Sequence, residues 1–170
     1  MWIQFGKMDN IFEHNHISMR KKALITLVIV AAIAIPIGIY TISPLFISAT
    51  VNESLPVTAT IPKERILSGT FRGVDDGFHN AQGNIKVVSL PDGSKILRLE
   101  NFKSTNGPNV HVYLSSDKRA TDYVDLGKLK ANNGNQNYNI PVGTDITKHN
   151  IVLIWCKDFS VLFGSAALMT

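Results

Sequence analysis

Cys156 is the only cysteine of this 170-residue chain, and it closes the apolar run Ile151–Cys156. A cysteine acts as a nucleophile or redox group through its thiolate, and only where reagents can reach it. The turn expected after this run and the adjacent Lys157 would both favour a reactive thiolate. Free cysteines are also among the most frequently buried residues, where they only pack. The residues alone leave both interpretations open, and Cys156 is the candidate redox thiol.

Partners for a metal or haem at Cys156 are few. The histidines and the late methionine that follow the long apolar run near the N-terminus are His79, His111, His149 and Met169. Blue-copper sites use two histidines, a cysteine and an axial methionine, usually with a histidine soon after the cysteine, and none follows Cys156 here. Covalent haem attachment is excluded because the chain has no Cys-x-x-Cys-His. The sequence predicts no dedicated metal site.

Non-covalent haem needs an axial histidine, methionine or cysteine beside an open pocket. His111 is the best-placed candidate, because it shares an expected strand face with Tyr113. A histidine partly exposed on a strand, with no ligand, is the plainer interpretation. Cys156 and His111 are therefore the two candidate cofactor-binding residues.

The N-terminal part contains one long apolar run. Residues 23–47 carry no charge, and Arg20, Lys21 and Lys22 directly precede them. About 20 apolar residues span a bilayer, and basic residues flank the cytoplasmic side, so we expect a signal-anchor helix with residues 1–22 as a short cytoplasmic tail. Met19 offers an alternative start. A cleaved signal peptide and a buried core helix are the alternatives. The cell membrane is thus an expected partner, with the C-terminal part outside the cytoplasm.

The charge is nearly balanced on both sides of this run. Of the formal +4, the segment before residue 23 contributes +2 and the rest +2, with no basic stripe. Nucleic acid is therefore not expected as a partner. The chain also has no G-x-S-x-G and no H-E-x-x-H, so a hydrolytic enzyme is not expected.

The remaining chain favours a β fold. Residues 48–65 are rich in Ser, Thr and Pro and predict a linker, and residues 66–168 show short β-type runs between turn residues. Pro91-Asp92-Gly93-Ser94 predicts a hairpin turn. The expected strands are 66–72, 84–90, 95–102, 110–115, 123–129, 136–140, 151–157 and 160–168. They predict an all-β antiparallel sandwich of about eight strands.

Alternation along two of these strands predicts which faces are buried. Leu97 and Leu99 share one face, opposite the charged Arg98 and Glu100, as expected for a half-exposed strand. The run Ile151–Cys156 has no charged side chain and predicts a central strand covered on both faces.

Several blocks, in one order, resemble a known family. They are Gly69-Thr70-Phe71, residues 78–83 (FHNAQG), 97–102 (LRLENF), 106–114 (NGPNVHVYL), 126–130 (LGKLK), 134–141 (GNQNYNIP) and 154–159 (IWCKDF). Together they resemble the DM thirteen, or electron-transfer DM, domain family over about residues 66–168. The resemblance implies a β-sandwich related to DOMON domains, which bind haem or sugar.

The resemblance also makes Cys156, in Trp155-Cys156-x-x-Phe159, the signature residue. It implies a redox or electron-transfer role at the cell surface, through a free thiol or a bound group such as haem, with an unknown surface protein or electron-transfer partner. This role is not that of a turnover enzyme. The alternative is a non-catalytic surface module for binding or adhesion, in which Cys156 is structural.

Overall fold

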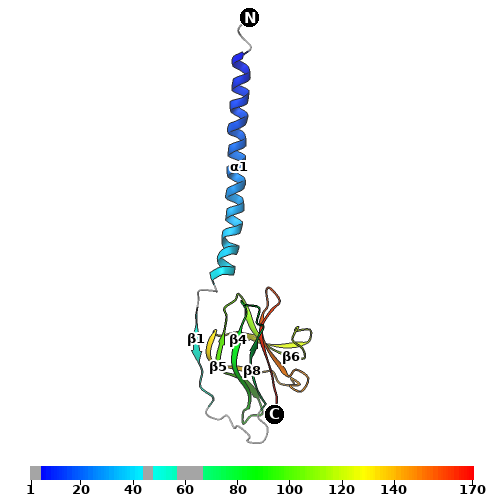
Figure 1. Cartoon of the computed structure of the whole chain (residues 1–170). Helices are drawn as coiled ribbons and strands as arrows, with labels where there is room; N and C mark the ends of the chain where they lie inside the picture. The colour runs from blue at the N-terminus through cyan, green and yellow to red at the C-terminus, as the bar shows by residue number, and fades with distance from the viewer. Residues whose placement is uncertain (1–4, 44–47, 57–66) are drawn as a thin grey trace. The chain divides into compact units, whose positions relative to one another are not determined.

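The protein is described here by a computed structural model, which covers residues 5–43, 48–56 and 67–170. The chain divides into two compact units between Ile42 and Ser43. The first consists of helix α1, and the second is a β-sandwich (Figure 1). Each unit is described by itself.

Helix α1 (Phe5–Ile42) contains the apolar run. Its part from Met19 to Ile42, 24 residues, is long and apolar enough to cross a membrane, and none of it is buried. At 1.5 Å per residue this part measures about 36 Å, more than the roughly 30 Å hydrocarbon core. Length and composition suit a membrane span or a signal sequence equally. The described helix ends at Ile42, and residues 44–47 of the expected anchor lie outside the described residues.

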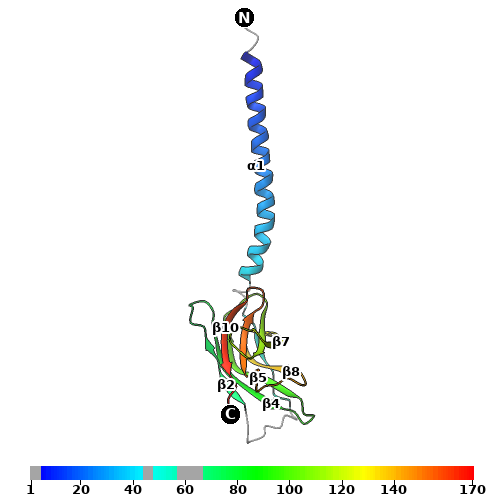
Figure 2. The same ribbon diagram turned by 90° about the vertical axis from the view of Figure 1, so that its right-hand side faces the viewer.

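Ten strands form two five-stranded sheets (Figures 1 and 2). The first sheet has the order β1 (Thr50–Asn52), β8 (Asn133–Ile140), β5 (Lys95–Ser104), β4 (Ala81–Ser89) and β2 (Ser68–Thr70). The second has the order β3 (Arg72–Gly73), β10 (Val161–Ala167), β9 (Ile151–Cys156), β6 (Val110–Ser115) and β7 (Tyr123–Lys128). The predicted all-β sandwich is thereby confirmed.

The structure differs from the predicted eight antiparallel strands in two places. The strand expected over 66–72 is divided into β2 and β3, which belong to different sheets, and residue 66 lies outside the described residues. Phe71 lies between them, buried in the core, with its N–H bonded to the Gly83 carbonyl. The second difference is β1, which pairs parallel to β8. The predicted hairpin at 91–94 is confirmed between β4 and β5.

The core lies between the two sheets and follows the predicted alternation. Leu97 and Leu99 of β5 face Val152 and Ile154 of β9 within one buried cluster. Small residues let the sheets approach closely where β10 passes β4. A Cβ added to Gly164 would lie 2.7 Å from the Cβ of Ala81, so only glycine fits there.

Residues 48–56 were expected in a linker, but the structure places them on the edge of the first sheet. The Glu53 carboxylate accepts hydrogen bonds from Lys130 Nζ at 2.7 and 3.0 Å and from the Asn137 N–H at 2.6 Å. Arg98 donates to the Glu53 carbonyl at 3.0 Å, and only 7% of Arg98 is exposed. The face expected to be open around Arg98 is therefore covered. The rest of the expected linker, 57–65, lies outside the described residues.

Glu53 provides a test of this docking. Burial by itself raises the pKa of its carboxyl, but the hydrogen bonds from Lys130 and Asn137 outweigh burial, so the net pKa is lowered. A lowered pKa in the folded state means that the carboxylate stabilises the fold above its unfolded pKa of about 4.5 and loses that effect as pH falls further. We expect Glu53→Gln to reduce the free energy of unfolding by about 1–2 kcal/mol at pH 7, and by less near pH 3.

The measurement is urea unfolding of the full chain in mild detergent, with tryptophan fluorescence as the readout. The control is Asp75→Asn on an exposed loop, where Asn tolerates the positive φ of 59°. Equal effects of the two substitutions would contradict docking of this segment.

Candidate functional site

Cys156 is the last residue of β9 and faces the core. Its register partners are Val110 on β6 and Val161 on β10. Only 2% of the residue is exposed, and its Sγ donates a hydrogen bond to the Pro108 carbonyl at 3.0 Å. The thiol is thus closed in at the end of its strand by the loop that precedes β6.

Four connections gather at this end of the sandwich, namely the loops 74–80, 105–109 and 129–132 and the turn 157–160. Figure 2 shows the β3–β4 loop and the β9–β10 turn at the same end. Backbone hydrogen bonds join them, from Thr105 N–H to the Asn80 carbonyl at 3.0 Å and from Lys157 N–H to the Asn109 carbonyl at 3.1 Å. We call this the cysteine end.

His111, the second candidate, lies on the other face of the same sheet. It pairs in register with Trp155, so it points outward where Cys156 points into the core. Its Nδ1 lies 2.9 Å from Asp125 Oδ1, and its Nε2 lies 3.0 Å from Asn109 Oδ1. Both ring nitrogens are engaged, and the structure does not bring His111 and Cys156 together.

The contacts of His111 extend into a polar network, which consists of Asn109, His111, Asp125, Lys157 and Asp158. Asn109 Nδ2 also donates to Asp158, and Lys157 Nζ lies 3.4 Å from Asp125 Oδ2. Burial alone raises the pKa of the Asp125 carboxyl, but hydrogen bonds from His111 and from the Gly127 N–H outweigh it. The net pKa of Asp125 is lowered, so this residue is a carboxylate at neutral pH.

An aromatic cluster lies beside this network on the same outer face. Tyr113 is 1% exposed and stacks on Tyr123 with ring centroids 4.2 Å apart. Trp155 lies 6.4 Å from Tyr113. Burial raises the pKa of the Tyr113 phenol, and the Asp125 charge adds to the effect. Tyr113 therefore stays protonated, and Tyr123 is the exposed member of the cluster.

The other two histidines of the sandwich form separate contacts. His79 Nδ1 lies 2.6 Å from Asp76 Oδ2, and its ring packs 4.7 Å from that of Phe163. His149 Nε2 lies 3.1 Å from Asp122 Oδ1. Among the described residues, no three His, Cys, Asp or Glu side chains are arranged to hold a metal ion.

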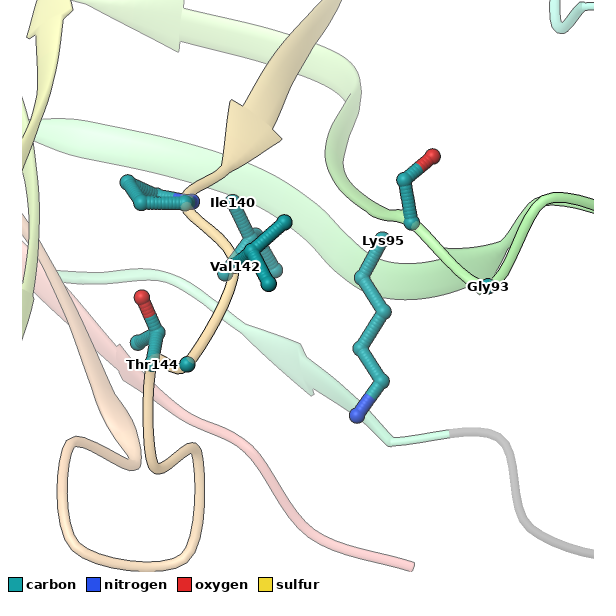
Figure 3. Close-up of a pocket in the computed structure, with 8 residues that line it drawn as sticks. Gly93, Lys95, Ile140, Val142 and Thr144 are labelled. Carbon is teal, nitrogen blue, oxygen red and sulfur yellow. The ribbon is translucent and has the colours of Figure 1, made fainter.

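The described cavities lie away from both candidates. One of about 110 Å³ is enclosed by the hairpin after β4 and the loop after β8. Figure 3 shows Ile140 and Val142 on one side of it and Gly93 and Lys95 on the other. Lys95 pairs with Ile140, at the end opposite Cys156. Two open grooves along the first sheet also lack Cys156 and His111.

Sequence reasoning missed Asn109 and Asp125, which fix His111. Asp125 lies on β7 opposite Tyr113, within the strand expected over 123–129. Pairing β6 with β7 around the intervening turn would have placed it on the outer face near His111. Asn109 has a positive φ of 50°, and the Gly-Pro-Asn sequence before β6 was the signal for a tight turn there.

The second unit is thus a two-sheet β-sandwich with a buried free cysteine at the end of a central strand. The chain belongs to the electron transfer DM13 family, whose model matches residues 71–168. The suspected family is thus confirmed, and with it an electron-transfer domain. Comparisons with curated proteins and with solved structures gave no match.

The His111–Asp125 contact predicts a pH effect. Because the pKa of Asp125 is lowered in the fold, its carboxylate stabilises the native state above its unfolded pKa near 3.8, and this effect disappears as pH falls. We expect His111→Gln to reduce the free energy of unfolding by about 1 kcal/mol at pH 6, and to flatten its decline between pH 5 and 3. Urea unfolding at several pH values measures both effects.

The control for this measurement is Lys148→Gln, which removes the exposed ion pair between Lys148 and Asp122. Exposed ion pairs contribute little to stability. If the free energy of unfolding of the two variants has the same pH profile, the network around His111 stabilises the fold no more than an exposed ion pair does.

Proposed function

We propose that this protein is a membrane-anchored electron-transfer module in which Cys156 is a redox thiol that opens by local displacement of loop 105–109. The domain limits proposed for it are a short tail over 1–22, an anchor over 23–47, and the sandwich. The N-terminus lies in the cytoplasm and the sandwich outside it. Family membership supports the electron-transfer role, and the basic residues 20–22 directly before the apolar run support this orientation.

The observation that carries the thiol role is the position of Cys156. Its Sγ is covered at the strand end by the Pro108 carbonyl, in a loop, whereas Val152 and Ile154 on the same face lie deeper within β9. Loops open at lower free energy than central strands, so this thiol can become accessible without unfolding the sandwich.

Because the chain has a single cysteine, its redox step is a thiol–disulfide exchange with another protein. The thiol first loses its proton to solvent, and the thiolate then attacks a disulfide of a partner protein. One S–S bond forms between Cys156 and the partner as the partner's own S–S bond breaks, and the leaving sulfur takes the electron pair. A thiolate of a dithiol donor protein then attacks Cys156 Sγ and releases the partner with both of its sulfurs reduced. The second thiolate of the donor displaces Cys156 as thiolate and closes a disulfide in the donor, so two electrons pass from the donor to the partner.

Haem does not fit the residues as they are folded. Cys156 and His111 lie on opposite faces of their sheet, and both His111 nitrogens are engaged. None of the described cavities contains either residue. Cys156 and His111 as folded therefore do not form a haem site.

The second candidate function is a non-catalytic binding or adhesion module on the cell surface. The burial of Cys156, 2% exposed within the core cluster, is the observation in its favour. The two functions differ in how the thiol becomes exposed, and this difference can be measured.

The decisive measurement is native-state thiol labelling of the full chain in mild detergent over a range of urea concentrations. We expect Cys156 to react through local opening, with a free energy of opening about 2 kcal/mol or more below that of global unfolding, and with little dependence on urea. The matched control is the double variant Cys156→Ser with Val152→Cys, whose thiol sits deep in β9 on the same face. Equal opening free energies at the two positions would make Cys156 structural and favour the binding module.

An absorption spectrum of the chain purified from membranes tests the exclusion of haem. We expect no Soret band in the wild type, because the candidate ligands are engaged or separated. A Soret band that disappears in His111→Gln would contradict this conclusion and restore His111 as an axial ligand.

A further inference from the structure

The chain enters the sandwich at the cysteine end. Thr50, the first residue of β1, pairs with Asn133, which pairs in turn with Lys103 at the end of β5. Asn133 N–H bonds to the Ala49 carbonyl, and Ser104 N–H bonds to the Asn132 carbonyl. Because β5 leads through loop 105–109 into β6, where Val110 pairs with Cys156, these residues and the thiol share one end of the sandwich.

The connection from the apolar helix is short. Only residues 43–49 separate the end of α1 from the start of β1. Seven residues reach at most about 25 Å when fully extended. If α1 spans a membrane, the end of the sandwich at which Thr50 enters stays within that reach of the membrane surface.

This end presents apolar side chains to solvent. Phe78 is 81% exposed on the β3–β4 loop, and Phe159 is 55% exposed on the β9–β10 turn. Val74, on the same loop as Phe78, is also exposed. Exposed aromatic residues on adjacent loops are unusual on a soluble surface, and aromatic side chains favour the membrane interface.

The Phe78 loop is held in this form by its own contacts. The Asp76 carboxylate accepts hydrogen bonds from the N–H groups of Phe78 and His79, at 2.9 and 2.6 Å. The His79 ring packs on Phe163, which belongs to the core. The neighbour of Phe78 is thus fixed to the sandwich while Phe78 itself points outward. These bonds also lower the pKa of Asp76 to about 2, so the loop keeps this form at neutral pH.

We propose that the cysteine end docks on the lipid surface of the membrane that α1 spans, with Phe78 and Phe159 in the interfacial layer. This inference rests on the proposed membrane anchoring. The docking is apolar rather than ionic, because this end of the sandwich has no excess of positive charge. Its four connections carry three acids, Asp75, Asp76 and Asp158, and two bases, Lys130 and Lys157. Binding therefore does not depend on anionic lipid.

The test places a tryptophan on the proposed surface and another at the opposite end. Val142 is 97% exposed on the loop after β8, far from the cysteine end, so Val142→Trp is the matched control for Phe78→Trp. Each full-length variant is reconstituted in phosphatidylcholine vesicles with brominated acyl chains. The signal of wild-type Trp2 and Trp155 is subtracted as background. We expect bromine to quench the tryptophan at position 78 at least about twofold more than the one at 142.

Equal quenching at positions 78 and 142 would overturn the docking. So would a blue shift at position 78 that grows with the protein-to-lipid ratio without bromine quenching, because a second copy of the chain would then cover the loop. A third overturning result is quenching at 78 that appears only with anionic lipid.

A separate measurement distinguishes failure of the docking from failure of the proposed function. Extraction at alkaline pH releases a chain that lacks a membrane anchor. Release of this protein from the membrane would therefore contradict the proposed anchoring. A chain that resists extraction but shows equal quenching is anchored without docking. Cys156→Ser should leave the quenching unchanged, so the redox role is tested independently.

Discussion

The packing of β9 between β6 and β10 is the constraint on which the rest of the sandwich depends. Every side chain of β9 is uncharged, and the strand lies at the centre of its sheet with neighbours on both sides. Val152 and Ile154 enter the core and Leu153 is buried on the outer face, so the strand needs cover on both faces. Tyr113 lies beside Leu153 on that face as its cross-strand partner, and it is buried as well. Cys156 takes its burial from this packing, as the last residue of the strand.

Several of the connections between the two sheets meet at one end of the sandwich. Three connections that cross between the two sheets, 74–80, 105–109 and 129–132, lie at the cysteine end, whereas 141–150 crosses from β8 to β9 at the other end. Their backbone hydrogen bonds tie the loops to one another, and close contact between Gly164 and Ala81 holds the sheets together nearby. One end of the domain thus contains the chain entry, the thiol and the exposed Phe78 and Phe159, whereas the small cavity beside Lys95 lies at the other.

The sequence predicted the parts of the fold that depend on local pattern. Alternation gave the buried faces of Leu97 and Leu99, the uncharged run gave β9, and Asp92-Gly93 gave the hairpin. The sequence did not predict features that depend on contacts between segments far apart in the chain. Residues 48–56 have a linker composition, and their place beside β8 depends on Glu53 meeting Lys130 and Asn137, more than 70 residues away. The partners of His111 lie closer in sequence, but predicting them requires both the pairing of β6 with β7, which places Asp125, and the turn that places Asn109.

The two faces of the second sheet carry different chemistry, and loop 105–109 connects them. On the inner face the Pro108 carbonyl accepts a hydrogen bond from the Cys156 thiol. On the outer face Asn109 contacts His111 and Asp158, and its carbonyl accepts the Lys157 N–H. Moving this loop uncovers the thiol only by breaking contacts on both faces. Access to Cys156 is therefore coupled to the polar network, and anything that weakens the hold of His111 and Asp158 on Asn109 also makes the thiol easier to reach.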